Sequence, residues 1–331
     1  MSVTKKIFGS CLVTGGTGLL GSELVKQLLD SGEATKVVCL IRDYVPQSRI
    51  FTEQLDQRVV IVRGDIRDQD LLDRVMNEYE TKTVFHLAAQ TLVGQANQRP
   101  TETLDVNIRG TWALLEAARL NSKHVQAVLF ASSDKAYGDL KGERYTESFP
   151  LAGKHPYDVS KSCADLIAQT YAHTFGLNVC VTRCGNFFGP GDLNESRIFP
   201  STILAILRGE DPVIRSNGQF IRDYIYVSDG ASAYRTLARQ MFGGDHRGEA
   251  FNFSYGLRLS VLDVANTIIK VMGSKRQLKI LNQASNEIPV QALDSSKAIK
   301  QLNWKPDFGF EQGVEKTVAW YRDQFEKGLL A

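Results

Sequence analysis

Cysteine is scarce in this chain, and so is any imbalance of charge. The 331 residues include five cysteines without a C-x-x-C pair, and the formal net charge is +2. An odd number of cysteines argues against a disulfide framework. Interspersed charges, with no basic stripe or acidic tail, argue against nucleic acid and membrane surfaces as partners. A small molecule remains as the expected ligand.

Long apolar runs are missing as well. No stretch approaches the roughly 18 apolar residues that a membrane span needs. Lys5 and Lys6 precede an apolar run, but Gly9, Gly15 and Gly16 interrupt it and no small-residue cleavage site follows. We therefore interpret the N-terminus as a first strand and expect the protein in the cytoplasm.

A glycine cluster follows that first strand. Residues 7–14 are apolar and β-compatible, and they run into G-G-T-G-L-L-G (Gly15 to Gly21) and then into a helical pattern. Gly15 permits a tight turn, Gly18 lets the backbone approach a pyrophosphate, and Gly21 allows close helix packing. The context predicts a dinucleotide site, which also includes Thr17, Leu19 and Leu20.

The end of the second expected strand, 36–42, bears on the choice of cofactor. A dinucleotide site commonly places an acid on the adenosine ribose at this point. This chain has Arg42 there, followed by Asp43. An arginine can pair with a 2′-phosphate, which favours NADP, whereas Asp43 could serve NAD if the register slips by one. An exposed arginine at a strand end is the plain alternative.

Further strands are expected at 58–63, 83–87, 125–131 and 178–182, with helices at 101–120 and 157–175. This alternation predicts a Rossmann-like, doubly wound parallel sheet with its ligand crevice at the carboxyl ends of the strands. We expect a dinucleotide-binding domain over 1–185 and a smaller α/β lobe over 186–331, with the chain crossing between them. His86, inside an apolar strand without an acid or metal-spaced partner, is expected to be structural, and no metal is expected. The other cofactor residues expected at the crevice are Asp65, Ile66, Leu87, Ala88, Ala89, Gln90 and Asn107.

The strand expected at 125–131 leads into the residues that carry chemistry. It is followed by Ser133, Asp134 and Lys135, and the next helix presents Tyr157 and Lys161 on one face. A phenol with a pKa of about 10 is a poor base at neutral pH, and a neighbouring ammonium would lower that pKa. We therefore expect Lys161 to lower the pKa of Tyr157. Asp134 and Lys135 could instead be a surface ion pair.

Together, G-G-T-G-L-L-G, H-L-A-A-Q, S-S-D-K-A-Y-G, Y-D-V-S-K, R-C-G-N-F-F-G-P and R-D-Y-I-Y-V resemble the extended short-chain dehydrogenase/reductase family over nearly the whole chain. Within it the chain is similar to nucleotide-sugar 4,6-dehydratases and epimerases. The resemblance implies that Ser133, Tyr157 and Lys161 are catalytic. It also implies a nucleoside diphosphate sugar as substrate, whose contacts would include Gln90, Ser133, Asn186, Arg197, Phe199, Val213, Arg215 and Arg222.

Asp134 and Lys135 discriminate among family members. By resemblance, 4-epimerases have small or apolar residues after the catalytic serine, whereas dTDP-glucose dehydratases carry an acid followed by glutamate. Asp-Lys resembles CDP-glucose 4,6-dehydratases and the inverting UDP-N-acetylglucosamine dehydratases. We therefore expect a CDP-glucose 4,6-dehydratase, with a 4-epimerase as the alternative and a nonenzymatic NADP-binding sensor as a third possibility.

Two expectations concern packing. Residues 294–325 are interpreted as two amphipathic helices with Trp304, Trp320 and Phe325 as anchors. By resemblance, the helices at 101–120 and 157–175 would form a four-helix bundle in a homodimer. That bundle would hide Trp112, Leu115 and the face around Leu166.

Overall fold

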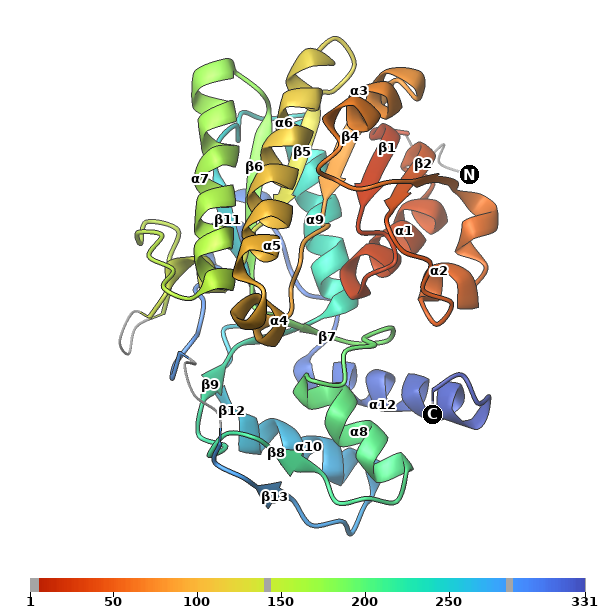
Figure 1. Cartoon of the computed structure of the whole chain (residues 1–331), viewed down its shortest axis with the longest axis vertical. Coiled ribbons are helices and arrows are strands. Elements are labelled where there is room, and N and C mark those ends of the chain that lie inside the picture. The colour runs from red at the N-terminus through yellow and green to blue at the C-terminus, as the bar shows by residue number, and fades with distance from the viewer. Residues whose placement is uncertain (1–5, 140–143, 284–287, 331) are drawn as a thin grey trace.

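The computed structural model describes residues 6–139, 144–283 and 288–330. Its centre is a seven-stranded parallel sheet in the order β11-β6-β5-β4-β1-β2-β3 (Figure 1). This is the Rossmann-like α/β architecture that the sequence predicts. The strands are β1 (Gly9–Thr14), β2 (Ala34–Ile41), β3 (Val60–Arg63), β4 (Thr81–His86), β5 (Ala127–Ala131), β6 (Val179–Cys184) and β11 (Ala250–Phe253).

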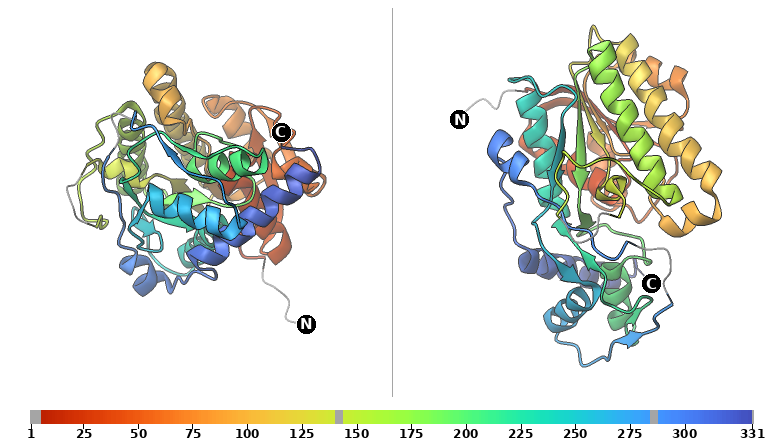
Figure 2. Two further views of the ribbon diagram at one scale, coloured as in Figure 1. Left: turned by 90° about the horizontal axis from the view of Figure 1, so that it is seen from below. Right: turned by 90° about the vertical axis from the view of Figure 1, so that its left-hand side faces the viewer.

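Helices cover both faces of this sheet, and the two views agree on their sides (Figure 2). Alternate strand side chains point to opposite faces. In β1, Cys11 and Val13 therefore pack with Leu24 on one face, whereas Leu12 packs with Leu114 on the other. The first face carries α1 (Leu19–Ser31) and α9 (Val227–Met241); the second carries α3 (Gln69–Glu78), α6 (Gly110–Leu120) and α7 (Pro156–Phe175).

The chain returns to the central sheet after it has entered the smaller lobe. β11 pairs with β6 in parallel, and α9 packs beside α1 on the sheet. Neither element is identified in the sequence analysis, which expects a crossing but not its place. Residues after 186 are thus divided between the sheet and the smaller lobe.

The smaller lobe has its own apolar core, in which Phe188, Phe199, Tyr224 and Val264 are buried. Three helices and three short two-stranded sheets enclose it. The helices are α8 (Ile198–Leu207), α10 (Val261–Met272) and α12 (Phe310–Glu326). The strand pairs are β7 (Asn186–Phe188) with β10 (Tyr224–Tyr226), β9 (Ile221–Arg222) with β12 (Leu259–Ser260), and β8 (Val213–Ile214) with β13 (Lys279–Ile280).

The two helices expected near the C-terminus are present as α11 (Ser296–Leu302) and α12. Trp304 is buried in the core on the α9 side of the sheet, and Trp320 and Phe325 pack against the core of the smaller lobe. The remaining short helices are α2 (Arg49–Thr52), α4 (Val93–Gln98), α5 (Pro100–Leu104) and the 3₁₀ turns η1 (Leu55–Arg58) and η3 (Asp134–Tyr137).

The helix expected at 101–120 is continuous, but one turn of it is wider than an α-helix. α5 leads into a π-helical turn, η2 (Asp105–Arg109), and then into α6. Leu115 on α6 is fully buried in the core of the single chain, so the expectation that a dimer hides it is wrong. Trp112 and Leu166 are exposed, at 44% and 53%. Among the described helices, none is long and apolar enough to cross a membrane.

Candidate active site

The site forms where β5 ends and η3 begins. Ser133 precedes η3, and its Oγ accepts a hydrogen bond from Lys135 N at 3.2 Å. The same hydroxyl donates to Asp134 Oδ1 at 2.9 Å. Ser133 thus fixes the turn that presents the next two side chains, because its hydroxyl is engaged both as acceptor and as donor.

Asp134 is a buried carboxyl rather than half of a surface ion pair. Asp134 is 3% exposed, and its Oδ2 has no hydrogen-bond partner among the described residues. Burial raises the pKa of Asp134, although Lys135, the Ser133 hydroxyl and Arg222 oppose the rise. A carboxyl with a raised pKa can retain a proton and donate it, which is what a general acid requires.

Tyr157 and Lys161 lie one turn apart at the start of α7, as the sequence predicts. Burial, with Asp134 second, raises the pKa of Tyr157 to about 12, against the effects of Arg197 and the Ser133 hydroxyl. Burial lowers the pKa of Lys161 to about 8, and its Nζ donates to Ala131 O at 2.6 Å. In the protein alone the Tyr157 pKa is raised because burial of the phenol dominates, and the lowering by Lys161 stays a prediction.

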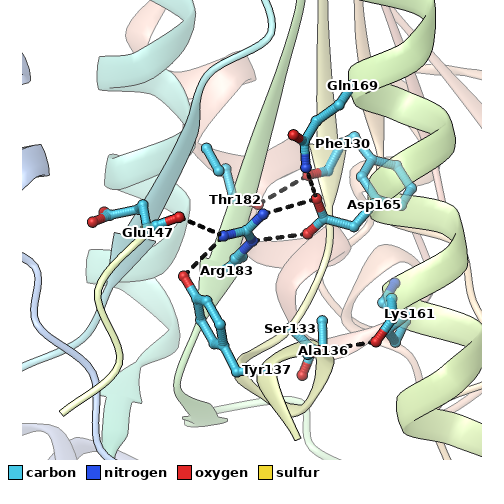
Figure 3. A network of polar contacts seen from close by, with 12 residues as sticks. Phe130, Ser133, Ala136, Tyr137, Glu147, Lys161, Asp165, Gln169, Thr182 and Arg183 are labelled. Carbon is cyan, nitrogen blue, oxygen red and sulfur yellow. Dashed lines mark hydrogen bonds and ion pairs between the residues drawn. The ribbon is translucent and has the colours of Figure 1, made fainter. Parts of the chain in front are cut away.

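A buried ion pair joins α7 to the strand beside it. Arg183 on β6 donates from Nε and Nη2 to the two carboxylate oxygens of Asp165, at 2.8 and 3.0 Å (Figure 3). Its Nη1 donates to the Tyr137 hydroxyl at 3.0 Å, and Tyr137 donates in turn to Asn252 Oδ1. This network connects α7, β6, η3 and β11, and therefore fixes the helix of Tyr157 relative to the turn of Asp134.

Arg183 and Asp165, which hold the elements of the site together, are not among the site residues predicted from the sequence. Asp165 lies four residues after Lys161, so a helical face shared by the two was a usable signal. Nothing in the local pattern indicates its partner, because Arg183 lies on another element and meets Asp165 only in the folded chain.

The glycine turn has the geometry that a dinucleotide requires. Gly15 has a φ of 73°, and a Cβ there would lie 2.9 Å from Ala88 N. A Cβ on Gly21 would lie 2.1 Å from Gly15 O, so the helix packs directly on the turn. Gly18 precedes α1, whose amino end presents free backbone N–H groups to an anion. These residues fit the pyrophosphate of NAD(P).

Asn107 and His86 organise the backbone behind that turn. Asn107, in the π turn, accepts from Gln90 N and donates to Gln90 O and to Ser160 Oγ. Asn107 therefore ties the backbone at Gln90 to the first turns of α7. His86 shares a 2.8 Å hydrogen bond with Thr14, and burial lowers its pKa to about 3, which agrees with a structural role.

The adenosine end of the predicted site is more exposed. Arg42 follows β2 and contacts Asp43 at 2.7 Å, with the two side chains 57% and 63% exposed. Asp65 accepts from the Arg67 guanidinium at 2.7 Å, and Arg67 also meets Asp105. The contact of Asp65 with the cofactor therefore stays a prediction.

Arg222 lies on β9 and Asn186 on β7, both in the smaller lobe. Arg222 is 7% exposed, and its Nη1 donates to Ile288 O at 2.7 Å. Asn186 Nδ2 donates to Asp223 O at 3.2 Å. Arg197, just before α8, pairs with the buried Asp192 at 3.2 Å.

Three further predicted substrate contacts lie on or beside α8 and β8 of the smaller lobe. Phe199 is 2% exposed and stacks on Phe188 with ring centroids 4.3 Å apart. Its burial makes it a core residue of the smaller lobe, and its predicted contact with the substrate stays a prediction. Val213 and Arg215 are exposed on and after β8. Within the part of the chain that the structure describes, no group of His, Cys, Asp or Glu side chains is arranged to hold a metal.

The fold and the Ser133, Tyr157 and Lys161 arrangement define a dinucleotide-binding protein of the extended short-chain dehydrogenase/reductase class. More particularly, residues 12–317 match the model of the GDP-mannose 4,6-dehydratase family, and the chain belongs to that family of nucleotide-sugar dehydratases and epimerases.

Individual relatives include both kinds of enzyme. A dTDP-glucose 4,6-dehydratase of Actinoplanes sp. is 33% identical over 319 residues, covering 94% of this chain and 97% of its own. The structure of DesIV, a dTDP-glucose 4,6-dehydratase of Streptomyces venezuelae with NAD bound, has a TM-score of 0.87 at 29% identity, covering 96% and 98%. A UDP-glucose 4-epimerase of Thermotoga maritima also has a TM-score of 0.87, at 26% identity, covering 96% and 99%.

Proposed function

We propose that this chain is a nucleotide-sugar 4,6-dehydratase, which converts a nucleoside diphosphate hexose into its 4-keto-6-deoxy form. The observation that carries the proposal is Asp134. Its carboxyl is buried, its Oδ2 has no partner among the described residues, and its pKa is raised by burial. A 4-epimerase needs Tyr157 and Lys161 but has no use for an acid held ready beside them.

The first step is oxidation at C4 of the sugar. Tyr157, as phenolate, takes the O4 proton, and Ser133 orients the hydroxyl. NAD, when bound, supplies the hydride acceptor and a positive charge beside Tyr157. That charge and Lys161 offset the burial that holds the phenol pKa at about 12 in the protein alone.

The second step removes water from C5 and C6. The C4 ketone acidifies the C5 proton, which Lys135 takes in its neutral form. Asp134 gives its proton to the C6 hydroxyl, which leaves as water. The hydride then returns to C6 and a proton to C5, so the net change is the loss of one water.

The proposal also concerns which nucleotide the sugar substrate carries. CDP-glucose is favoured by the Asp134–Lys135 sequence, by resemblance, whereas the named dehydratase relatives act on dTDP-glucose. The structure gives no specific contact to either base, since Phe199 is in the core. We keep CDP-glucose as the proposal and dTDP-glucose as its direct competitor.

We propose NAD as the cofactor, in place of the NADP that Arg42 favours from sequence. Arg42 is already paired with Asp43, and Asp65 lies close enough to act on its charge. A 2′-phosphate would meet both carboxylates, whereas a ribose diol would find an acceptor in Asp43. The DesIV structure similarly contains NAD.

One experiment distinguishes a dehydratase from an epimerase and identifies the nucleotide of the substrate. The purified protein, supplied with NAD, is incubated in turn with CDP-, dTDP-, UDP- and GDP-hexoses, and the products are weighed by mass spectrometry. The proposal predicts a product lighter than its substrate by one water. A product of unchanged mass with inverted C4 would establish the epimerase instead.

A further inference from the structure

Lys135 is held by a residue that none of the sequence motifs contains. Gln291 is fully buried, and its Oε1 accepts a hydrogen bond from Lys135 Nζ at 3.0 Å. A charged lysine can only donate, and in the structure the amide oxygen of Gln291 is the atom that faces Lys135 Nζ.

The other end of the same amide is unsatisfied. Gln291 Nε2 is buried without a hydrogen-bond partner among the described residues. A buried donor left unpaired destabilises the fold, because it has lost its hydrogen bond to water and gained none in exchange. If Gln291 served only to fill space, an apolar side chain of the same length would do so without an unpaired donor. The polar amide therefore indicates that its contact with Lys135 has a function.

The backbone of Gln291 is tied to the strand that carries Arg222. Gln291 N donates to Ile221 O at 3.0 Å, and Ile221 N donates to Pro289 O at 2.9 Å. Arg222 Nη1 reaches back to Ile288 O on the same segment. The position of Lys135 Nζ is thus set by the segment that also contacts Arg222, a predicted substrate-binding residue.

The neutrality of the Gln291 amide matters as much as its position. Two carboxyls interact with the charge of Lys135: Asp134 on its own turn, on which Arg222 also acts, and Asp158 at the start of α7, on which His155 also acts. Burial raises the pKa of both Asp134 and Asp158, so each is biased toward its neutral form. A neutral amide as the partner of Nζ adds no further charge that would favour the ammonium.

We infer that Gln291 is a positioning residue for the elimination step, which holds Lys135 Nζ toward C5 of the sugar through a neutral acceptor. The inference rests on the proposed dehydratase function, because it gives Lys135 the role of base. It assigns Gln291 no contact with the reacting atoms.

Two variants of similar size separate position from charge. Gln291→Met keeps the length and removes the acceptor, and Gln291→Glu keeps the acceptor and adds a negative charge. For Gln291→Met we expect elimination to slow by about 10- to 100-fold, as for a displaced catalytic group. Reduced nicotinamide should then accumulate during turnover, because oxidation at C4 does not use Lys135.

In Gln291→Glu, as in the wild type, the rate of elimination should rise with pH. The rise should occur at higher pH than in the wild type. The sign follows because the carboxylate stabilises the ammonium, and only the neutral amine is a base. NAD affinity and the rate of C4 oxidation, measured on the same NAD-loaded protein with CDP- or dTDP-glucose, should match the wild type in both variants and thereby report correct folding.

The inference is overturned if Gln291→Met eliminates water at the wild-type rate, or if Gln291→Glu leaves the pH profile in place. Lys135→Met distinguishes this from a failure of the proposed function. If Lys135→Met stalls while the Gln291 variants are normal, only the inference about Gln291 is wrong. If Lys135→Met itself turns over normally, the dehydratase proposal is wrong.

Discussion

The two ends of the predicted cofactor crevice are built differently. At the catalytic end, Asp134 and Lys161 are buried, and the buried pair of Arg183 and Asp165 joins the elements that carry them. At the adenosine end, Arg42 and Asp43 are more than half exposed and pair with each other. Charges in the first region are set by burial and by partners distant in sequence. Those in the second depend on neighbours along the chain and on solvent.

This difference indicates where function tolerates change. A buried charge that loses its partner stays desolvated, so a change at the catalytic end should have large effects on rate or on folding. An exposed pair is worth little on its own, so a change at the adenosine end should alter the choice of cofactor and little else.

The largest effect is expected for Lys135→Met, which removes the proposed base and keeps the apolar stem. The turnover number should fall by about 10³-fold, in the range typical of a lost general base. C4 oxidation should persist, so reduced nicotinamide should accumulate in stopped-flow absorbance. Lys123→Met, on an exposed lysine beyond α6, is the control and should behave as wild type.

Arg183→Met should have the largest effect on stability. It leaves Asp165 buried and unpaired, which should lower the free energy of unfolding by about 3–5 kcal/mol in urea titration. The double variant Arg183→Met with Asp165→Leu should recover most of the loss. Lys327→Met breaks an exposed pair with Asp323 and should leave stability unchanged. An Arg183→Met protein as stable as wild type would show that the pair does not hold the site together.

Features that depend on local sequence are predicted well, whereas features that depend on contacts in the folded chain are not. Strands such as β1 and β5 are apolar runs bounded by glycine or polar residues, so their places are predicted closely. β11 is missed because its four residues acquire a sheet partner, β6, only in the folded chain. The raised pKa of Tyr157 is unpredicted for a similar reason, since burial is not visible in the spacing of Tyr157 and Lys161.

At the adenosine end, Asp43→Ala should weaken NAD by about 1.5 kcal/mol, or roughly tenfold in Kd, because a charge-assisted hydrogen bond to the ribose is lost. Arg42→Ala is the matched control and should change NAD affinity much less, as measured by fluorescence titration. If the wild type binds NADP more tightly than NAD and Arg42→Ala abolishes that preference, Arg42 grips the 2′-phosphate and NADP is the cofactor.

The smallest effect on catalysis is expected at the face of α6 and α7. Trp112 and Leu166 are exposed there, and we propose that a second copy of the chain covers them. Light scattering should give the mass of a dimer, and Leu166→Arg should shift it toward the monomer without changing turnover per chain. Leu166→Ala is the milder control. A wild-type monomer at micromolar concentration would contradict the proposal.

The central claim is that hydride removed from C4 returns to C6 of the same sugar after water has left. The direct measurement uses substrate labelled with deuterium at C4, in ordinary water, with the product examined by NMR. The account predicts a 4-keto-6-deoxy product with deuterium at C6, and, for unlabelled substrate in heavy water, deuterium at C5. A product that retains the label at C4, with the configuration there inverted, would contradict the account and identify the chain as an epimerase.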